Sequence, residues 1–261
     1  MTSMSKPIHV RGRVVAAGQE PLVCAPLVAR SAAALGAEAA KVAAKQPDLI
    51  EWRVDFFEHL GDTAAVLAGA AAVRQAAAGI PIIFTRRSIR EGGETIGLDE
   101  EAVCALQEAV CASGSIDFVD CELSCDPAHL RRTLAAAHAH GVQLIASFHN
   151  FKLTPSADEI VAKFKAAAAA GADIAKVAVM PTSLDDVLTL LGATLRGTRE
   201  VELPLITMSM GGYGALTRMA GWMFGSSISF AVGDRASAPG QMPIGDLRQV
   251  VEILQRSLRG A

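Results

Sequence analysis

The sequence predicts a (β/α)₈ barrel, an α/β fold in which eight parallel strands form a closed ring inside a ring of helices. Eight short apolar segments alternate with alanine-rich helical stretches at intervals of roughly 25–35 residues, which is typical of repeated β–α units. The chain has 261 residues, close to the roughly 250 that such barrels contain. No Pro/Gly/Ser-rich linker divides it, so we expect one domain over 1–261. A doubly wound open sheet is the alternative.

The elements follow in order along the chain. Residues 8–15 alternate apolar and polar side chains about Gly12, which predicts a small hairpin. The predicted barrel strands are 22–28, 49–57, 81–87, 118–123, 143–150, 174–180, 205–210 and 228–232. A capping box at 156–159 predicts the start of a helix that Gly171 ends. Leu184, Val187, Leu188 and Leu191 recur at helical spacing, so we expect one buried stripe on a helix that begins near Ser183.

Composition excludes several classes of protein. The hydrophobic fraction of 51% and charged fraction of 20% are those of a globular protein, and a net charge of −3 gives no basic patch for nucleic acid or an anionic membrane. We find neither a secretory signal nor an uninterrupted apolar run long enough to span a membrane, so we expect a cytoplasmic protein. We interpret the five cysteines as reduced packing residues. Cys121 and Cys125 flank a predicted strand end, but no second pair has zinc-ligand spacing.

Lys176 is the only one of seven lysines that lies inside a buried apolar strand. A buried ammonium is costly unless it is paired, and a desolvated neutral lysine is the usual nucleophile in Schiff-base chemistry. Two interpretations therefore remain: a nucleophilic amine, or a lysine that reaches the strand end or pairs with an acid.

Other polar residues lie at the carboxyl ends of the predicted strands, where a barrel holds its active site. Glu51, Arg53 and Asp55 share one strand face, and Trp52 and Val54 share the other. Further members of the set are Arg87, Asp120, Glu122 and His149, the last being the only one of six histidines that we place within a strand. A structural ion pair is an equal alternative for Asp55, Asp120 and Glu122. An amine, an imidazole and guanidinium groups together favour chemistry on a carbonyl compound that carries a carboxylate.

Two loops complete this end of the predicted barrel. The glycines at 211–214 precede a helix with Arg218, and they are either an anion-binding nest or a flexible turn. Residues 233–241 are small and polar, as in a lid that closes over a substrate.

Several of these motifs resemble one family. They are Glu51-Trp52-Arg53-Val54-Asp55, Arg87-Ser88 with Glu91-Gly92-Gly93, Lys176 before Val177-Ala178-Val179-Met180-Pro181, Ile206-Thr207-Met208-Ser209-Met210, and Ala236-Ser237-Ala238-Pro239-Gly240-Gln241. From about residue 21 to the C-terminal helix, the chain resembles type I 3-dehydroquinate dehydratase, the Schiff-base enzyme of the shikimate pathway of aromatic amino-acid biosynthesis. The departures from the family pattern are Pro26, Arg86, Asn150 and the Gly211-Gly212-Tyr213 turn.

The resemblance implies a carbon–oxygen lyase that converts 3-dehydroquinate to 3-dehydroshikimate by syn elimination. Lys176 would form the imine, His149 would transfer protons, and Glu91 would orient His149. Substrate contacts would come from Glu51, Arg53, Arg87, Arg218, Ser237 and Gln241. The family further implies no cofactor, no metal, a homodimer, and a hairpin covering the barrel bottom. A Schiff-base aldolase and a non-catalytic sensor on the same fold are the competing functions.

Overall fold

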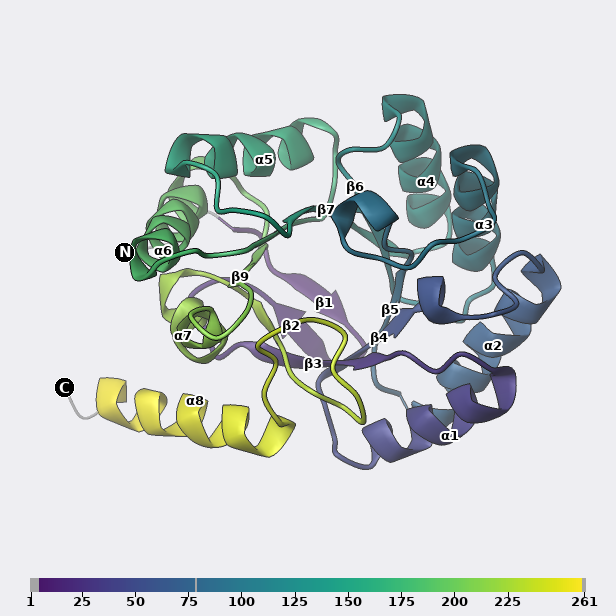
Figure 1. The fold of residues 1–261 in the computed structure, drawn as a ribbon, viewed down its shortest axis with the longest axis horizontal. Coiled ribbons are helices and arrows are strands. Elements are labelled where there is room, and N and C mark those ends of the chain that lie inside the picture. The colour runs from purple at the N-terminus through teal and green to yellow at the C-terminus, as the bar shows by residue number, and fades with distance from the viewer. Residues whose placement is uncertain (1–4, 78, 260–261) are drawn as a thin grey trace.

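A computed structural model describes residues 5–77 and 79–259. Eight parallel strands lie in the order β10-β3-β4-β5-β6-β7-β8-β9, and helices surround them (Figure 1). The strands are β3 Leu22–Leu27, β4 Leu49–Arg53, β5 Ile82–Thr85, β6 Phe118–Glu122, β7 Gln143–Asn150, β8 Ile174–Val179, β9 Leu205–Ser209 and β10 Ile228–Phe230. The helices are α1 Ala32–Ala43, α2 Thr63–Ala76, α3 Glu100–Ala112, α4 Pro127–Ala139, α5 Ala157–Ala169, α6 Leu184–Glu200, α7 Ala215–Ala220 and α8 Ile244–Arg259, with 3₁₀ turns Val54–Phe56, Ile89–Glu91 and Gly221–Phe224.

The ring closes between β9 and β10 by a single parallel bridge instead of a strand ladder. The bridge pairs Leu205 with Ser226, and the Ser227 amide donates to the Leu205 carbonyl at 2.7 Å. The predicted barrel is therefore confirmed, and the open-sheet alternative is wrong.

Alternating side chains along each strand separate an inner from an outer apolar cluster. Trp52 and Val54 belong to the outer cluster, between strands and helices. Leu49, Ile83 and Phe118 belong to the inner one. Because their strands continue with Glu51, Thr85 and Asp120 on the same face, the interior changes from apolar to polar toward the carboxyl ends.

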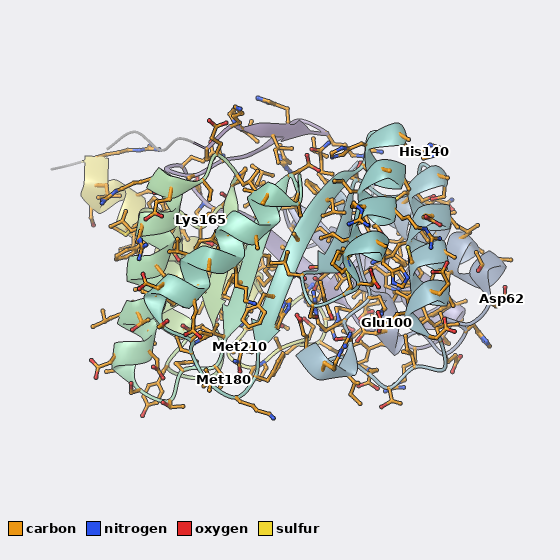
Figure 2. The ribbon with its side chains drawn as sticks, turned by 90° about the horizontal axis from the view of Figure 1, so that it is seen from above. Asp62, Glu100, His140, Lys165, Met180 and Met210 are labelled. Atoms are coloured by element: carbon orange, nitrogen blue, oxygen red, sulfur yellow. The ribbon has the colours of Figure 1, made fainter. Side chains whose placement is uncertain are left out.

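The predicted hairpin is confirmed and lies at the amino end of the barrel. β1 Ile8–Val10 pairs antiparallel with β2 Arg13–Val15, and Val15 is buried against the inner cluster. In Figure 2 the hairpin is at the opposite end of the barrel from Met180 and Met210, which follow β8 and β9. The barrel bottom is thus covered, as expected. His9 lies in β1, so His149 is not the only histidine within a strand.

One helix begins as predicted but buries a different face. The capping box at Ser156 and the left-handed Gly171 bound α5 as expected, and Ser183 caps α6. The predicted stripe on α6 is wrong, because Leu184 and Leu188 are 61% and 62% exposed. The buried face instead follows Val187, Leu190, Leu191 and Thr194, where the Thr194 hydroxyl is satisfied by the Leu190 carbonyl and Thr207.

In the part of the chain that the structure describes, every helix is too short or too polar to cross a bilayer.

Candidate active site

A pocket lies at the carboxyl ends of the strands. It contains about 440 Å³ of space outside protein atoms, part of it open to solvent. Its lining includes every predicted site residue except Arg218, namely Glu51, Arg53, Arg87, Glu91, His149, Lys176, Ser237 and Gln241. The structure therefore brings together residues that are far apart in the sequence, of which Glu51 and Gln241 are separated by 190 positions.

Lys176 points into the barrel and is held there by three contacts. Its Nζ lies 3.0 Å from Asp120 Oδ2 and 3.4 Å from Glu51 Oε1, and 4.8 Å from the centroid of the Phe230 ring. The side chain is 5% exposed. The lysine is thus desolvated, as the first interpretation requires, and paired with acids, as the second one states.

Arg87 organises the floor of the pocket together with two acids. Its guanidinium contacts Asp120 Oδ1 at 2.8 Å and Glu122 Oε1 at 3.0 Å, and donates to Ser147 Oγ at 2.9 Å. Burial alone would lower the pKa of Arg87, but Asp120, Glu122 and Glu91 outweigh it and raise the pKa. Burial would raise the pKa of Asp120, and the nearby Arg87 and Lys176 lower it instead. The ion-pair interpretation of Asp120 and Glu122 therefore holds, and Asp120 in addition contacts Lys176.

His149 is held from one side by Glu91. Glu91 Oε2 lies 2.9 Å from His149 Nδ1 and accepts the His149 amide at 2.9 Å. Burial, and then Arg87 and Lys176, hold the pKa of His149 well below 6.5, so the imidazole is neutral near pH 7. Nδ1 therefore carries the hydrogen when Glu91 is ionised, which leaves Nε2 as the proton acceptor.

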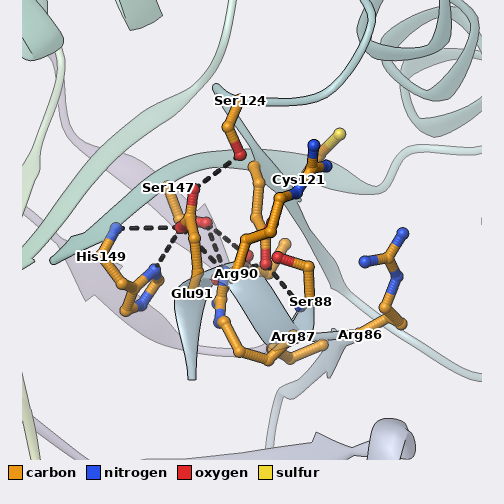
Figure 3. A network of polar contacts seen from close by, with 12 residues as sticks. Arg86, Arg87, Ser88, Arg90, Glu91, Cys121, Ser124, Ser147 and His149 are labelled. Atoms are coloured by element: carbon orange, nitrogen blue, oxygen red, sulfur yellow. Dashed lines mark hydrogen bonds and ion pairs between the residues drawn. The ribbon is translucent and has the colours of Figure 1, made fainter. Parts of the chain in front are cut away.

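Glu91 is fixed by a residue that the sequence analysis did not single out. Ser124, in the loop after β6, donates from Oγ to Glu91 Oε1 at 2.7 Å. Figure 3 shows Ser124 and His149 bound to the same carboxylate. Burial, and next repulsion by Glu122, raise the pKa of Glu91 to about 7. No strand pattern marks Ser124, because loop residues do not obey the alternation that locates the others.

Arg53 and Asp55 form a buried bidentate pair with contacts of 2.8 and 2.7 Å. Asp55 also accepts the Arg87 amide at 3.3 Å and the Glu94 amide at 3.2 Å, so it fixes the loop after β5. A structural role is thus the better interpretation for Asp55, while Arg53 reaches the pocket.

The segment 233–241, the predicted lid, contributes Ser237, Ala238 and Gln241 to the pocket lining. Arg53 donates to the Ser237 carbonyl at 3.4 Å, and Gln241 is bonded to Ser237 through both side-chain amide atoms, at 2.9 and 3.2 Å. The Gly211 amide donates to the Pro239 carbonyl at 3.2 Å.

Arg218 lies behind the pocket wall. Its guanidinium donates to the Phe230 carbonyl at 3.3 Å and the Pro239 carbonyl at 3.1 Å, and among the described residues it has no carboxylate partner. Burial lowers the pKa of Arg218 to about 10, so it remains a cation near pH 7. An uncompensated buried cation favours an anionic ligand nearby.

The rest of the pocket wall is apolar, and the sequence analysis did not assign its residues to the site. Phe151, Ala178, Met208, Met210, Phe230 and Ala238 line it. Met208 and Met210 are two residues apart at the end of β9, so the inward alternation of that strand was a usable signal.

The glycine turn, Arg86 and Asn150, which depart from the family pattern, leave these contacts intact. Gly211 has φ +69°, and a Cβ on Gly214 would lie 2.0 Å from the Ser209 carbonyl oxygen, which favours a tight turn over an anion nest. Arg86 turns outward to Glu100 Oε2 at 2.5 Å, and Asn150 accepts the Lys152 amide at 2.9 Å.

Known proteins are similar to this chain in sequence and in fold. The family model for type I 3-dehydroquinase matches residues 23–257. The 3-dehydroquinate dehydratase of Aromatoleum aromaticum is 57% identical over 258 residues, which cover 99% of each chain. The crystal structure of 3-dehydroquinate dehydratase from Geobacillus kaustophilus HTA426 superposes with a TM-score of 0.95 at 49% identity, covering 98% of this chain and 99% of that one. A Clostridium difficile type I 3-dehydroquinate dehydratase, determined with covalent modified comenic acid, has a TM-score of 0.93 at 33% identity, covering 97% and 99%. The chain belongs to the type I 3-dehydroquinase family.

Proposed function

We propose that this chain dehydrates 3-dehydroquinate to 3-dehydroshikimate through a Schiff base on Lys176, as a step of the shikimate pathway. The observation that carries the proposal is a desolvated lysine at the mouth of the barrel, in one pocket with a neutral imidazole. In the β7–β8 register Ser147 is opposite Lys176 and His149 is opposite Ala178. The Cα atom of His149 therefore lies about 7 Å farther toward the mouth along the strands than the Cα atom of Lys176, and both side chains line the same pocket.

The reaction follows from these positions. The ammonium of Lys176 passes a proton to His149 Nε2, and the neutral Nζ attacks the C3 ketone. The imidazolium returns that proton to the carbinolamine hydroxyl, which leaves as water and gives the iminium. The iminium withdraws electrons from C2, so a base of ordinary strength can remove the C2 proton. His149 Nε2 takes that proton and returns it to the departing C1 hydroxyl, which leaves as water. Hydrolysis of the imine releases 3-dehydroshikimate and restores the lysine.

Charge complementarity supports an anionic substrate. Arg218 is a buried cation with no carboxylate partner among the described residues. It contacts the Pro239 carbonyl, and Gln241, two residues farther along, lines the pocket. Arg218 reaches the substrate carboxylate once the Pro239 carbonyl yields its place. Glu51, Arg53 and Arg87 then remain for the ring hydroxyls, with Ser237 on the lid.

Trapping the imine tests the proposal. Borohydride added to protein and 3-dehydroquinate should reduce the imine to a stable secondary amine on Lys176, located by peptide mass. Lys176→Met, which keeps the volume of the side chain, should form no adduct and show no rise in the ultraviolet absorbance of the conjugated enone. Lys165→Ala is the matched control, because this exposed lysine forms an ion pair with Glu200 on the outer surface and its loss should change neither result. An adduct on another lysine would remove Lys176 from the mechanism.

We further propose that the protein is a cytoplasmic homodimer. The family resemblance supports the dimer, and the exposed Leu184 and Leu188 on α6 provide apolar surface that a second copy would cover. Sedimentation velocity at micromolar concentration measures the mass, and a monomer would contradict the dimer. Fractionation of cells tests the cytoplasmic location.

A further inference from the structure

Two cysteines lie in contact beside the site. Cys121 Sγ and Cys125 Sγ are 3.7 Å apart. Cys121 is in β6 and 4% exposed, whereas Cys125 is half-buried in the loop that follows. Cys24, Cys104 and Cys111 are buried elsewhere, and no other two cysteines of the described residues are in hydrogen-bond contact. The pair therefore combines a thiol that solvent can reach, Cys125, with a buried thiol, Cys121, and the two sulfur atoms are in hydrogen-bond contact.

The two thiols differ in reactivity. The hydrogen bond from Cys121 lowers the pKa of the Cys125 thiol. The same contact, followed by burial, raises the pKa of Cys121. The more exposed sulfur is thus the one that ionises first and attacks, and the buried one is placed to resolve the product.

The turn between the cysteines carries Ser124, which donates to Glu91 Oε1 at 2.7 Å. The first half of the turn is fixed: Cys121 and Glu122 pair with β7, and the Leu123 amide donates to the Ser147 carbonyl at 2.8 Å. A backbone movement that brings the sulfur atoms together therefore falls on Ser124 and Cys125.

We propose that Cys121 and Cys125 are a site of thiol–disulfide exchange, oxidised by low-molecular-mass disulfides such as oxidised glutathione. The Cys125 thiolate attacks one sulfur of the oxidant, forms a mixed disulfide and expels the first thiol. The Cys121 thiolate then attacks Cys125 Sγ, forms the Cys121–Cys125 bond and expels the second. Two protein thiols are oxidised, and one small disulfide is reduced to two thiols.

The disulfide acts on catalysis through Ser124, and this part rests on the proposed function. A sulfur–sulfur bond is about 2.05 Å long, whereas the two sulfur atoms are 3.7 Å apart. The turn that carries Ser124 takes up part of this approach, and the 2.7 Å hydrogen bond to Glu91 has little slack because it weakens beyond about 3 Å. Ser124 leaves Glu91, and the carboxylate that orients His149 loses its second anchor. Oxidation therefore slows dehydration without touching a residue that contacts the substrate.

The test treats the purified full-length chain with oxidised glutathione. Alkylation before and after reduction, with peptide mapping, should show a Cys121–Cys125 bond. The rate of enone formation should fall roughly tenfold, the effect of losing one hydrogen bond to a charged group, and dithiothreitol should restore it. Cys125→Ser should keep the untreated rate under the same treatment. Cys104→Ser, a buried thiol bonded to the His129 carbonyl, is the control and should respond like the unmodified chain.

A second pair of variants separates the coupling from the oxidation. Reduced Ser124→Ala should lose rate by a similar factor and move the acidic limb of the pH–rate profile upward, because the Ser124 hydrogen bond lowers the pKa of Glu91. Ser124→Thr, which keeps the hydroxyl, should retain both. Free thiols at Cys121 and Cys125 after treatment, or a disulfide without a change in rate, would overturn the proposal.

The two proposals fail in different ways. If the reduced chain does not dehydrate 3-dehydroquinate, the proposed function fails. The disulfide is still read by mass, and its coupling is still read by NMR titration of His149, which should shift on oxidation; an unchanged titration would overturn the coupling.

Discussion

Catalysis requires Glu91 in its ionised form, whereas its burial makes that form costly for the stability of the fold. Its carboxylate accepts two hydrogen bonds from His149 and one from Ser124, and these contacts favour the ionised form. Burial opposes ionisation more strongly and raises its pKa to about 7 from the usual 4.5. A group with this pKa changes its charge near physiological pH, so Glu91 is the natural origin of a pH effect.

We expect kcat/KM of the unmodified chain to fall as the pH drops through about 7, because protonated Glu91 no longer holds the Nδ1 hydrogen of His149 as a carboxylate does. Glu91→Gln should be slower by roughly 10–100-fold and should lack this limb. The pH dependence of kcat/KM for both proteins is the measurement. An unchanged limb in Glu91→Gln would assign the titration to another group.

The same variant should stabilise the fold at neutral pH. The unfolded chain loses the Glu91 proton near pH 4.5, whereas the folded chain keeps it until about pH 7. The stability of the unmodified chain therefore falls as pH rises through that window. Glu91→Gln removes this linkage, so its free energy of unfolding should exceed that of the unmodified chain by roughly 3 kcal/mol above pH 7. The gap should vanish below pH 4.5, and urea titrations at both pH values measure it.

At the scale of the element, the lid depends on a close approach between two backbone segments. Gly240 has φ +79°, and a Cβ on it would lie 2.3 Å from the Gly211 carbonyl oxygen. The adjoining Pro239 carbonyl accepts from the Gly211 amide and from Arg218. Only glycine allows the lid to lie against the β9–α7 turn while keeping these hydrogen bonds.

We expect Gly240→Ala to push the lid off this turn and to raise KM for 3-dehydroquinate roughly tenfold, with a smaller change in kcat, because the reacting groups stay in place. Gly212→Ala is the matched control, since a Cβ there meets no atom within 4 Å. Steady-state kinetics of both variants decide the matter. Equal KM values would mean that the lid does not contribute to binding.

The sequence predicted strands and their inward residues far better than contacts outside them. Period-two alternation located Glu51, Arg53, Lys176 and His149, because a strand end in a barrel has only two faces and one is apolar. The buried face of α6 was wrong because Thr194 is a polar member of that face, which hydropathy alone cannot identify. Ser124 is found only in three dimensions, since its partner lies 33 residues away.

At the scale of the whole molecule, the barrel interior is divided between two kinds of stability. Toward the amino end, Val15, Leu49, Ile83 and Phe118 of the inner cluster form an apolar plug beneath the hairpin. Toward the carboxyl end, buried charges pair with one another, which contributes less to stability than apolar packing does but holds each side chain in one position. The pocket therefore lies above a tightly packed apolar layer, and we expect substitutions of the charged residues at its mouth to alter function more than stability.

The seam between β9 and β10 is the weakest part of the ring, because side-chain hydrogen bonds replace a ladder there. Ser226 Oγ accepts the buried Thr207 amide at 2.9 Å, and β9 and β10 supply Met208 and Phe230 to the pocket wall. A loose seam would thus disturb both the ring and the wall.

We expect Ser226→Ala to lower the free energy of unfolding by about 1–3 kcal/mol, since it leaves the Thr207 amide buried without an acceptor. Ser227→Ala, one residue along, is the matched control. Its hydroxyl is buried and has no partner among the residues that the structure describes, so its removal should cost nothing or stabilise slightly. Urea denaturation of the two variants measures the difference. Equal losses of unfolding free energy in the two variants would mean that packing alone holds the ring at this point. A loss confined to Ser226→Ala would mean that the Ser226 hydroxyl stabilises the closure of the barrel where β9 and β10 lack a strand ladder.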